Sequence, residues 1–170
     1  MQTNRVLIFG NSASGKSSLA RHLSHTQNCA HLDLDSVAWR PMNSPDSAPK
    51  RCLVSESLVE IKPFLDSNAN WVIEGCYGDL IEAVSEHADE LLFLNLSTEQ
   101  CMSNAKKRPW EPHKYASKKE QDANLEMLLN WIAEYDQRSD SCSKQEHQRI
   151  FDAFSGNKQM LTEMPNLDSG

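Results

Sequence analysis

The chain has 170 residues, of which 39% are hydrophobic, and it carries a formal net charge of −7. This length fits a single domain that can bury its own core, which excludes a small scaffold dependent on disulfide or metal staples. The acidic balance argues against a broad nucleic-acid-coating surface, and the five widely spaced cysteines, with no CxxC pair, are typical of reduced thiols rather than of a zinc ribbon.

The first predicted element is a buried strand over residues 5–9, which leads directly into a glycine loop. The loop Gly10–Ser17 matches GxxxxGK[ST] at every fixed position, and apolar residues at helical spacing follow it. In this strand–loop–helix context the backbone N–H groups curl around phosphate oxygens, assisted by the positive end of the helix dipole. Lys16 is expected to reach the β- and γ-phosphates and Ser17 to ligate Mg²⁺. The alternative is a flexible Gly/Ser turn that binds nothing.

The next predicted strand ends in two carboxylates. Residues 31–35 read His-Leu-Asp-Leu-Asp, and a period of two places Asp33 and Asp35 on the same face if the strand continues that far. Two acids beside a phosphate loop repel one another unless a cation is present, which favours a functional role over a solvated strand end. Residues 40–50 contain three prolines and are predicted to form a loop.

Helices and strands then alternate to the end of the chain. The predicted elements are a helix over 53–66 that Pro63 bends or breaks, a strand over 71–73 closed by Glu74 and Gly75, a helix over 78–87, a strand over 91–96, a helix to residue 107, an irregular segment over 108–117, two further helices, of which the second stops at Gly156 as its C′ residue, and a strand over 158–161. Capping boxes open three of these helices: Ser97 with Gln100, Ser117 with Glu120, and Ser143 with Glu146. Trp39 and Trp71 are predicted core residues, the cysteines are predicted buried apolar groups, and the tail over 163–170 is predicted to fray.

This alternation predicts an α/β fold of the P-loop NTPase class, with an open parallel five-stranded sheet flanked by helices. No internal repeat or second domain is visible, so residues 1–170 are expected to form one domain. Ligands of such sheets bind at the carboxyl ends of the strands.

A basic segment stands out in this acidic chain. Residues 106–119 contain six lysines and arginines and a single acid, Glu111. Phosphoryl transfer needs cations around the migrating group, and a mobile lid can supply them while excluding water, so residues 108–117 are predicted to form a small lid. Arg108 is the first candidate for a phosphate contact, and Arg138, after a long helix, is a second. The alternative is a solvated basic helix end and linker.

The motifs and their order resemble the small P-loop kinases, a group that includes adenylate kinase, shikimate kinase and gluconate kinase. The segments HLDLDSVAW, WVIEGCYGDL, RPWEPHKYAS and NLEMLLNWIAEYDQR are more specifically similar to bacterial adenylate-kinase-like ATPases, which are similar to the DNA topology modulation proteins. The resemblance covers roughly residues 4–162 and implies ATP and Mg²⁺ as ligands. The acid-Gly-Phe-Pro-Arg run of adenylate kinases is absent after Glu74, which weakens the case for a nucleoside monophosphate as acceptor.

Roles for individual residues follow from this resemblance. Asp33 occupies the place of a metal-associated carboxylate in shikimate-type kinases, and Asp35 the place of the carboxylate that holds a substrate hydroxyl. Glu74 occupies the place of the Walker-B-like acid of adenylate kinases, with Glu replacing the usual Asp. The candidate nucleotide ligands are Gly10, Asn11, Ser12, Ala13, Ser14, Gly15, Lys16, Ser17, Ser18, Arg108 and Arg138; the metal candidates are Ser17, Asp33 and Glu74; and the catalytic candidates are Lys16, Asp35, Glu74 and Arg108.

The pattern favours an ATP-dependent phosphotransferase that acts on a small hydroxyl- or phosphate-bearing acceptor. A nucleotide-dependent switch or slow ATPase is the alternative, and a DNA-linked regulator is a third class, against which the acidic balance counts. No apolar stretch reaches the length of a membrane span, and no signal peptide is visible, so the sequence predicts a cytoplasmic protein without membrane contact. A monomer or small homo-oligomer is expected, and both ATP and GTP stay open as donors.

Overall fold

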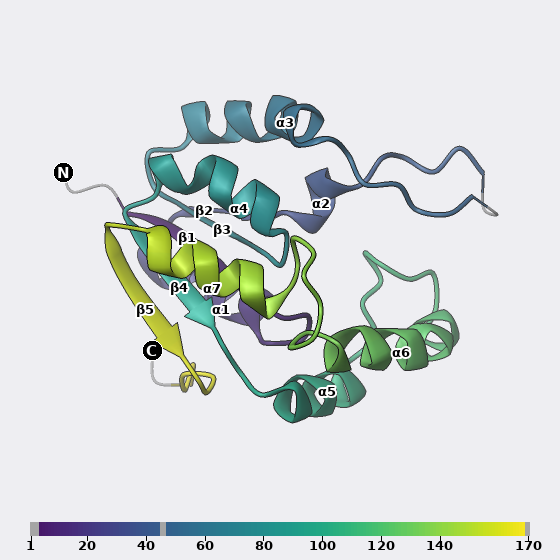
Figure 1. The fold of residues 1–170 in the computed structure, drawn as a ribbon. Helices are drawn as coiled ribbons and strands as arrows, with labels where there is room; N and C mark the ends of the chain where they lie inside the picture. The colour runs from purple at the N-terminus through teal and green to yellow at the C-terminus, as the bar shows by residue number, and fades with distance from the viewer. Residues whose placement is uncertain (1–3, 45–46, 169–170) are drawn as a thin grey trace.

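The computed structural model describes residues 4–44 and 47–168, which place one parallel sheet between two layers of helices (Figure 1). The strands are β1 (Arg5–Gly10), β2 (Ala30–Asp33), β3 (Trp71–Gly75), β4 (Glu90–Leu94) and β5 (Asn157–Leu161). The helices are α1 (Lys16–Gln27), α2 (Asp35–Ala38), α3 (Val54–Ser67), α4 (Gly78–Val84), the 3-10 helix η1 (Ser85–His87), α5 (Thr98–Lys107), α6 (Lys118–Ala133) and α7 (Lys144–Ala153). The predicted α/β fold with five parallel strands is confirmed.

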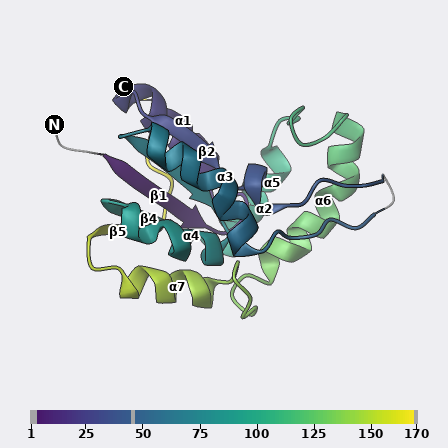
Figure 2. The same ribbon diagram turned by 90° about the horizontal axis from the view of Figure 1, so that it is seen from above.

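The sheet order β2-β3-β1-β4-β5 places β1 at the centre, with every neighbour parallel. Parallel neighbours send their carboxyl ends to one edge, so the residues that follow β1, β2 and β3 meet there. In Figure 2 the β1 arrow points toward the side of the molecule where α6 lies. The same edge therefore carries the glycine loop and faces the predicted lid.

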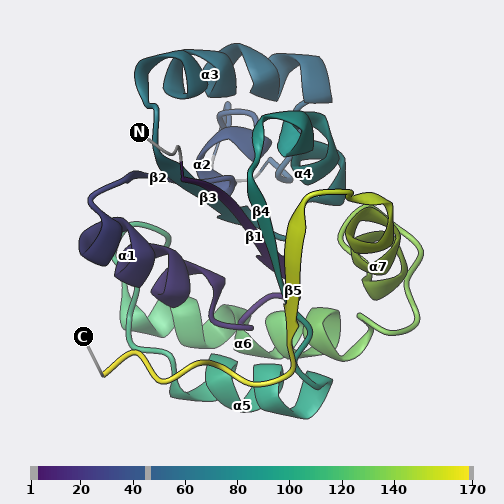
Figure 3. The ribbon, with the colours of Figure 1, turned by 90° about the vertical axis from the view of Figure 1, so that its left-hand side faces the viewer.

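Two apolar layers hold the sheet. Figure 3 shows α3, α4 and α7 on one side of the strands and α1, α5 and α6 on the other. Within β1, Leu7 and Phe9 pack into the first layer, while Val6 and Ile8 pack into the second. This is why β1 is apolar at successive positions rather than at alternate ones: both of its faces are buried.

The second strand is shorter than predicted. It ends at Asp33, Leu34 lies between the two elements, and Asp35 begins the short helix α2. The Asp35 N–H donates to Asp33 Oδ1 at 2.9 Å, a local side-chain turn that stops the strand. The prediction that both aspartates share a strand face is therefore wrong, because the chain turns between them.

Two other local details of the helices also differ from expectation. Pro63 does not break α3, which runs unbroken from Val54 to Ser67, so of its two predicted effects only a bend stays a prediction. Pro63 and Val59, whose carbonyl loses its helical partner, are both exposed, so water can replace the missing hydrogen bond. Gly156 does not cap α7, since Phe154 is the C-cap in extended conformation. A β-carbon at Gly156 would lie 2.7 Å from the Phe154 ring, so glycine leaves room for that ring instead.

Side-chain burial differs from expectation at two places. Trp71 is a core residue as predicted, but Trp39 is 42% exposed and lies at the cavity described below. Within residues 163–168 of the predicted frayed tail, Met164 and Leu167 pack against the second apolar layer. Pro45 and Asp46 of the predicted loop and residues 169–170 of the tail lie outside the described residues. Cys101 and Cys142 are buried, whereas Cys29, Cys52 and Cys76 are only partly so.

A buried histidine fixes the loop after β3. His147 on α7 is fully buried, and its Nε2 lies 2.7 Å from the carbonyl oxygen of Cys76. A carbonyl can only accept, so Nε2 carries the proton and Nδ1 accepts from the Tyr135 hydroxyl at 2.7 Å. Burial lowers the pKa of His147 to about 4. The neutral imidazole thus ties α7 to the loop that follows Glu74.

This histidine should make the fold sensitive to acid. Its pKa falls from 6.5 to about 4 on folding, so below pH 6.5 the unfolded chain binds the proton first and stability declines as the pH approaches 4. The shift corresponds to about 3 kcal/mol of unfolding free energy. Urea unfolding at pH 7 and pH 4.5 should show a smaller loss of stability in His147→Gln than in the native chain. His25→Gln, on the exposed surface of α1, is the control, and an equal loss in all three proteins would contradict this assignment.

Candidate functional site

The glycine loop has the backbone conformation of a phosphate cradle. Ala13 and Gly15 have φ angles of 60° and 96°, in the left-handed region. At Gly15 a β-carbon would also collide with the Met164 thioether, so only glycine fits. Two side chains anchor the loop: Asn11 Nδ2 donates to the Ile132 carbonyl at 3.2 Å, and Asn104 Nδ2 donates to the Ala13 carbonyl at 2.9 Å. Helices α5 and α6 thereby hold the loop open for a ligand.

The lysine of the glycine loop lines the large cavity of about 1000 Å³, called the main cavity below. Lys16 is largely buried, and its Nζ donates to the Asn11 carbonyl at 2.6 Å, the one hydrogen bond that it makes within residues 4–44 and 47–168. An ammonium has three donors, so the remaining ones are available to a ligand in the cavity. This is the placement expected for a residue that contacts a triphosphate.

The carboxylates beside the loop crowd together. Ser17 Oγ donates to Glu74 Oε1 at 2.8 Å, and Glu74 is almost fully buried. His31 Nε2 lies 3.4 Å from the same oxygen without the geometry of a hydrogen bond. Asp33 pairs with Glu74 across the β2–β3 register, and burial together with the charge of Glu74 raises the pKa of Asp33.

This donor set suits Mg²⁺. The hydroxyl of Ser17 and the carboxylates of Glu74 and Asp33 are hard oxygen ligands, and a divalent cation would relieve the repulsion that raises the pKa of Asp33. Within the described part of the chain, no group of three or more His, Cys, Asp or Glu side chains is arranged so that it could hold a metal ion without other ligands. Mg²⁺ in nucleotide sites uses only one or two protein carboxylates and takes its other ligands from phosphates and water. The structure brings Ser17 to Glu74 and places Asp33 opposite Glu74 in the sheet, and the binding of a metal by these three residues stays a prediction.

A hydrogen-bonded chain of side chains ends at Asp35. Trp39 Nε1 donates to the Tyr77 hydroxyl at 2.8 Å, and that hydroxyl donates to Asp35 Oδ1. Lys114 Nζ lies 3.2 Å from the other carboxylate oxygen. Burial opposes the charge of Asp35, but Lys114 and the Tyr77 hydroxyl outweigh it and hold the pKa of the carboxyl below its usual value. Asp35 is thus a fixed, ionised hydrogen-bond acceptor at the cavity.

The predicted lid reaches Asp35 through a residue that the sequence did not single out. Among the basic residues of the segment, Arg108 was the first candidate, yet its Nη1 lies 3.6 Å from Glu111 Oε2 of the same loop. Lys114 forms the contact across the cavity instead, and Asp35 and Glu111 keep the pKa of Lys114 raised although burial opposes this. A turn places Lys114, because its N–H donates to the Glu111 carbonyl at 3.0 Å. The feature in the sequence that could have indicated Lys114 is the turn Glu111–Lys114, which contains Pro112 and ends at this lysine.

Arg138 does not face the phosphate loop in this structure. Its Nε lies 3.1 Å from Asp140 Oδ2, and its guanidinium stacks 3.5 Å from the Trp131 ring centre. Trp131 and Asp140 line the main cavity, whereas Arg138 is not among its lining residues. Nearer partners therefore hold the Arg138 side chain, and its contact with a phosphate stays a prediction.

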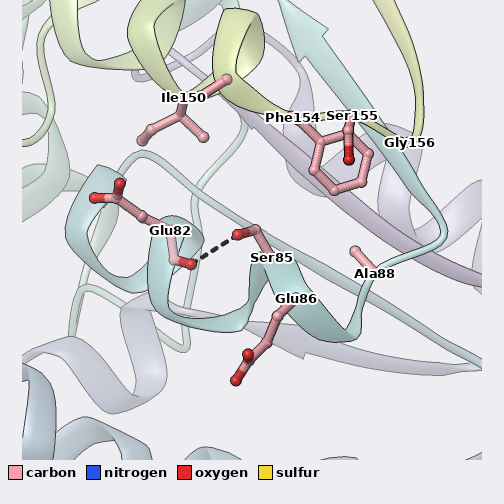
Figure 4. Close-up of a pocket in the computed structure, with 9 residues that line it drawn as sticks. Glu82, Ser85, Glu86, Ala88, Ile150, Phe154, Ser155 and Gly156 are labelled. Atoms are coloured by element: carbon pink, nitrogen blue, oxygen red, sulfur yellow. Dashed lines mark hydrogen bonds between the residues drawn. The ribbon is translucent and has the colours of Figure 1, made fainter.

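One cavity of about 1000 Å³ contains these groups together. Its walls come from the glycine loop, the ends of β2 and β3, and the predicted lid, and they include Lys16, Ser17, Asp33, Asp35, Glu74 and Arg108. A second cavity of about 380 Å³ lies between α4, η1 and α7 (Figure 4), where the Ser85 hydroxyl donates to the Glu82 carbonyl. None of the candidate site residues lines it, so the chemistry belongs to the larger cavity.

Solved structures share this architecture. A sugar kinase from Janibacter sp. HTCC2649 matches with 13% identity and a TM-score of 0.54, covering 98% of this chain and 89% of its own. A gluconokinase from Sinorhizobium meliloti 1021 matches with 14% identity and a TM-score of 0.54, covering 96% and 85%. TT1252 from Thermus thermophilus matches with 14% identity and a TM-score of 0.56, covering 98% and 92%. At these identities the likeness shows the fold alone.

The sequence itself shows the family. No curated protein matches the chain significantly. Residues 6–126, more than two thirds of the chain, match the AAA domain family, and this stretch contains the glycine loop, Asp33, Asp35 and Glu74. The chain therefore belongs to the AAA domain family, and it shares its fold with the sugar kinase and gluconokinase structures.

Proposed function

We propose that the protein is an ATP-dependent phosphotransferase that transfers the γ-phosphoryl group to a hydroxyl of a small acceptor. The observation that carries the proposal is the shared cavity: a complete phosphate loop and a fixed, ionised aspartate at the start of α2 face the same space. A protein that only hydrolyses nucleotide has no need for a second carboxylate that tyrosine and lysine hold in place at the cavity. The kinase names of the structural neighbours agree with this reading.

Each residue takes a defined role in the proposed reaction. The backbone of Gly10–Ser18 and the ammonium of Lys16 bind the phosphates of ATP. Ser17, Glu74 and Asp33 would hold Mg²⁺, which, when bound, supplies positive charge to the β- and γ-phosphates. Asp35 accepts the proton of the acceptor hydroxyl. At the same time the hydroxyl oxygen bonds to the γ-phosphorus, and the bond between that phosphorus and ADP breaks. Lys114 pairs with the other oxygen of Asp35 when the lid is closed, so the lid opens to admit the acceptor and closes for transfer.

A screen for ADP release tests the proposal. ATP and Mg²⁺ are supplied with nucleosides, nucleotides, sugars and hydroxy acids, and GTP replaces ATP in a parallel set. The proposal expects at least one acceptor to raise the rate of ADP release well above the rate with water alone. A rate that no acceptor changes would favour the switch or slow ATPase instead.

The role of the lid has its own test. Arg108→Ala should lower turnover by about 10²-fold while leaving the affinity for ATP nearly unchanged, because a lid cation acts mainly on charge that develops in the transition state. Lys118→Ala is the matched control, since Lys118 pairs with Asp122 on α6 and is not among the residues that line the main cavity. Arg138→Ala is expected to fall between the two.

Hydrogen exchange measures the closure directly. Amides of residues 108–117 should gain protection when a non-hydrolysable ATP analogue and Mg²⁺ are added, whereas amides of α5 should not. Equal protection with and without ligand would leave the segment as an ordinary loop.

A further inference from the structure

The one arginine and the one lysine on the acceptor side of the cavity are each paired with an acid. We call the acceptor half the part of the cavity formed by Asp35, Trp39, Arg51, Tyr77 and Lys114. Both of its cations have an acid partner: Arg51 Nη2 lies 3.1 Å from both carboxylate oxygens of Asp79, and Lys114 Nζ lies 3.2 Å from Asp35.

Arg51 is held in place as part of the wall. Its Nε donates to the Ala38 carbonyl at 3.1 Å, and its guanidinium carbon lies 4.5 Å from the Tyr77 ring centre. Arg51 also forms an isolated antiparallel β-bridge with Trp39, which brings together the two ends of the loop between them. An arginine that is stacked, paired and hydrogen-bonded in this way shapes the site and does not present a free fork to an anion.

The remaining charges at this end of the cavity are negative. Asp33 and Asp35 both line it, and Glu74 stands beside Asp33 in the sheet. The cations outside the acceptor half belong to the phosphate end or to the lid: Lys16 lies in the glycine loop, Arg21 on α1 has its Nη2 3.5 Å from Ser18 Oγ, and Arg108 faces Glu111. A carboxylate or phosphate on the acceptor would therefore meet acids without a free cation of its own.

The walls offer flat apolar surface instead. Trp39 in the acceptor half and Trp110 in the lid are 42% and 44% exposed, and both line the cavity. Exposed tryptophans gathered at one cavity mark a binding surface more than a folding core. Indole rings stack on the apolar face of a sugar or on a planar base. Sugars and nucleosides offer such a face together with hydroxyl groups.

From these contacts we infer that the acceptor is an uncharged, hydroxyl-bearing molecule with a flat apolar face, a neutral sugar or a nucleoside, and not a carboxylate or a phosphate ester. The inference rests on the proposed phosphotransferase function and narrows its acceptor. Asp35 receives the hydroxyl, the tryptophans stack on the ring, and the Arg51–Asp79 pair excludes anions by leaving no free cation.

Matched acceptor pairs test the inference on the full chain with ATP and Mg²⁺. Adenosine is compared with adenosine monophosphate, and glucose with gluconate, and transfer is followed as labelled phosphate in the acceptor. In the pair that the enzyme accepts as substrates, the neutral member should have a kcat/KM at least about tenfold higher than that of the charged member. The pair that responds distinguishes a nucleoside from a sugar as the source of the hydroxyl.

Two variants of α4 sharpen the test. Asp79→Asn frees Arg51 and should narrow the preference for the neutral acceptor by about fivefold or more, because an unpaired guanidinium attracts the anion. Glu82→Gln removes one of the two acids that pair with Arg149, but neither Glu82 nor Arg149 lines the main cavity, so the preference should not change.

The two modes of failure are distinct. Transfer that favours adenosine monophosphate or gluconate would overturn the inference and leave the phosphotransferase function standing. Label found only as inorganic phosphate, with every acceptor, would overturn both.

Discussion

Lys16→Ala is expected to lower the rate of ADP formation by about 10³-fold or more while the fold survives. The ammonium lies at the cavity with one hydrogen bond, to the Asn11 carbonyl, so its remaining donors can bind phosphate oxygens. Alanine removes that charge but keeps helix propensity at the first residue of α1. The loop backbone, anchored by Asn11 and Asn104, does not depend on the lysine side chain.

A coupled assay for ADP measures the loss, and circular dichroism with thermal unfolding confirms the fold. Lys107→Ala removes an equal charge from the exposed end of α5 and should leave the rate within about twofold. A Lys16→Ala protein that turns over ATP at the native rate would show that the loop does not bind the reacting phosphates.

Asp35→Asn is expected to lower kcat by about 10²-fold or more at saturating acceptor while the Kd for ATP stays nearly constant. Asparagine keeps the size of the side chain and can still accept from the Tyr77 hydroxyl, but it cannot take up the acceptor proton. It also loses the attraction to Lys114 that closes the lid over the acceptor half. The effect should therefore fall on transfer rather than on nucleotide binding.

Asp66→Asn, near the exposed end of α3, serves as the control for this substitution. Transfer rates are measured by label in the acceptor, and ATP affinity by calorimetry. An Asp35→Asn protein with native kcat would remove the aspartate from the reaction, and a parallel loss of ATP affinity would place it at the nucleotide instead.

The parts of the fold that follow from local patterns were predictable from the sequence. A continuous apolar run, a glycine loop and helical spacing define β1, the phosphate cradle and α1 within 23 residues, and each pattern depends on near neighbours in the chain. The meeting of Ser17, Asp33 and Glu74 follows from one further step, since parallel strands deliver their ends to one edge.

The contacts that depend on how distant loops dock could not be predicted. The pairing of Lys114 with Asp35 joins residues from the lid and from α2, and several lysines in the segment had equal claim by charge alone. Tryptophan is typical of a protein core, but Trp39 lies at the cavity, where it donates a hydrogen bond to Tyr77 and forms a β-bridge with Arg51. Arg138 pairs with Asp140, two residues away, a contact that its position after a long helix does not indicate.

The fate of the γ-phosphate tests the central claim most directly. ATP labelled at its γ-phosphorus is incubated with the protein, Mg²⁺ and an acceptor drawn from the ADP-release screen, and the products are separated. The proposed phosphotransferase predicts that most of the released label is covalently bound to the acceptor, and that Lys16→Ala and Asp35→Asn abolish this product. Label recovered entirely as inorganic phosphate, at a rate that the acceptor does not change, would contradict the proposal.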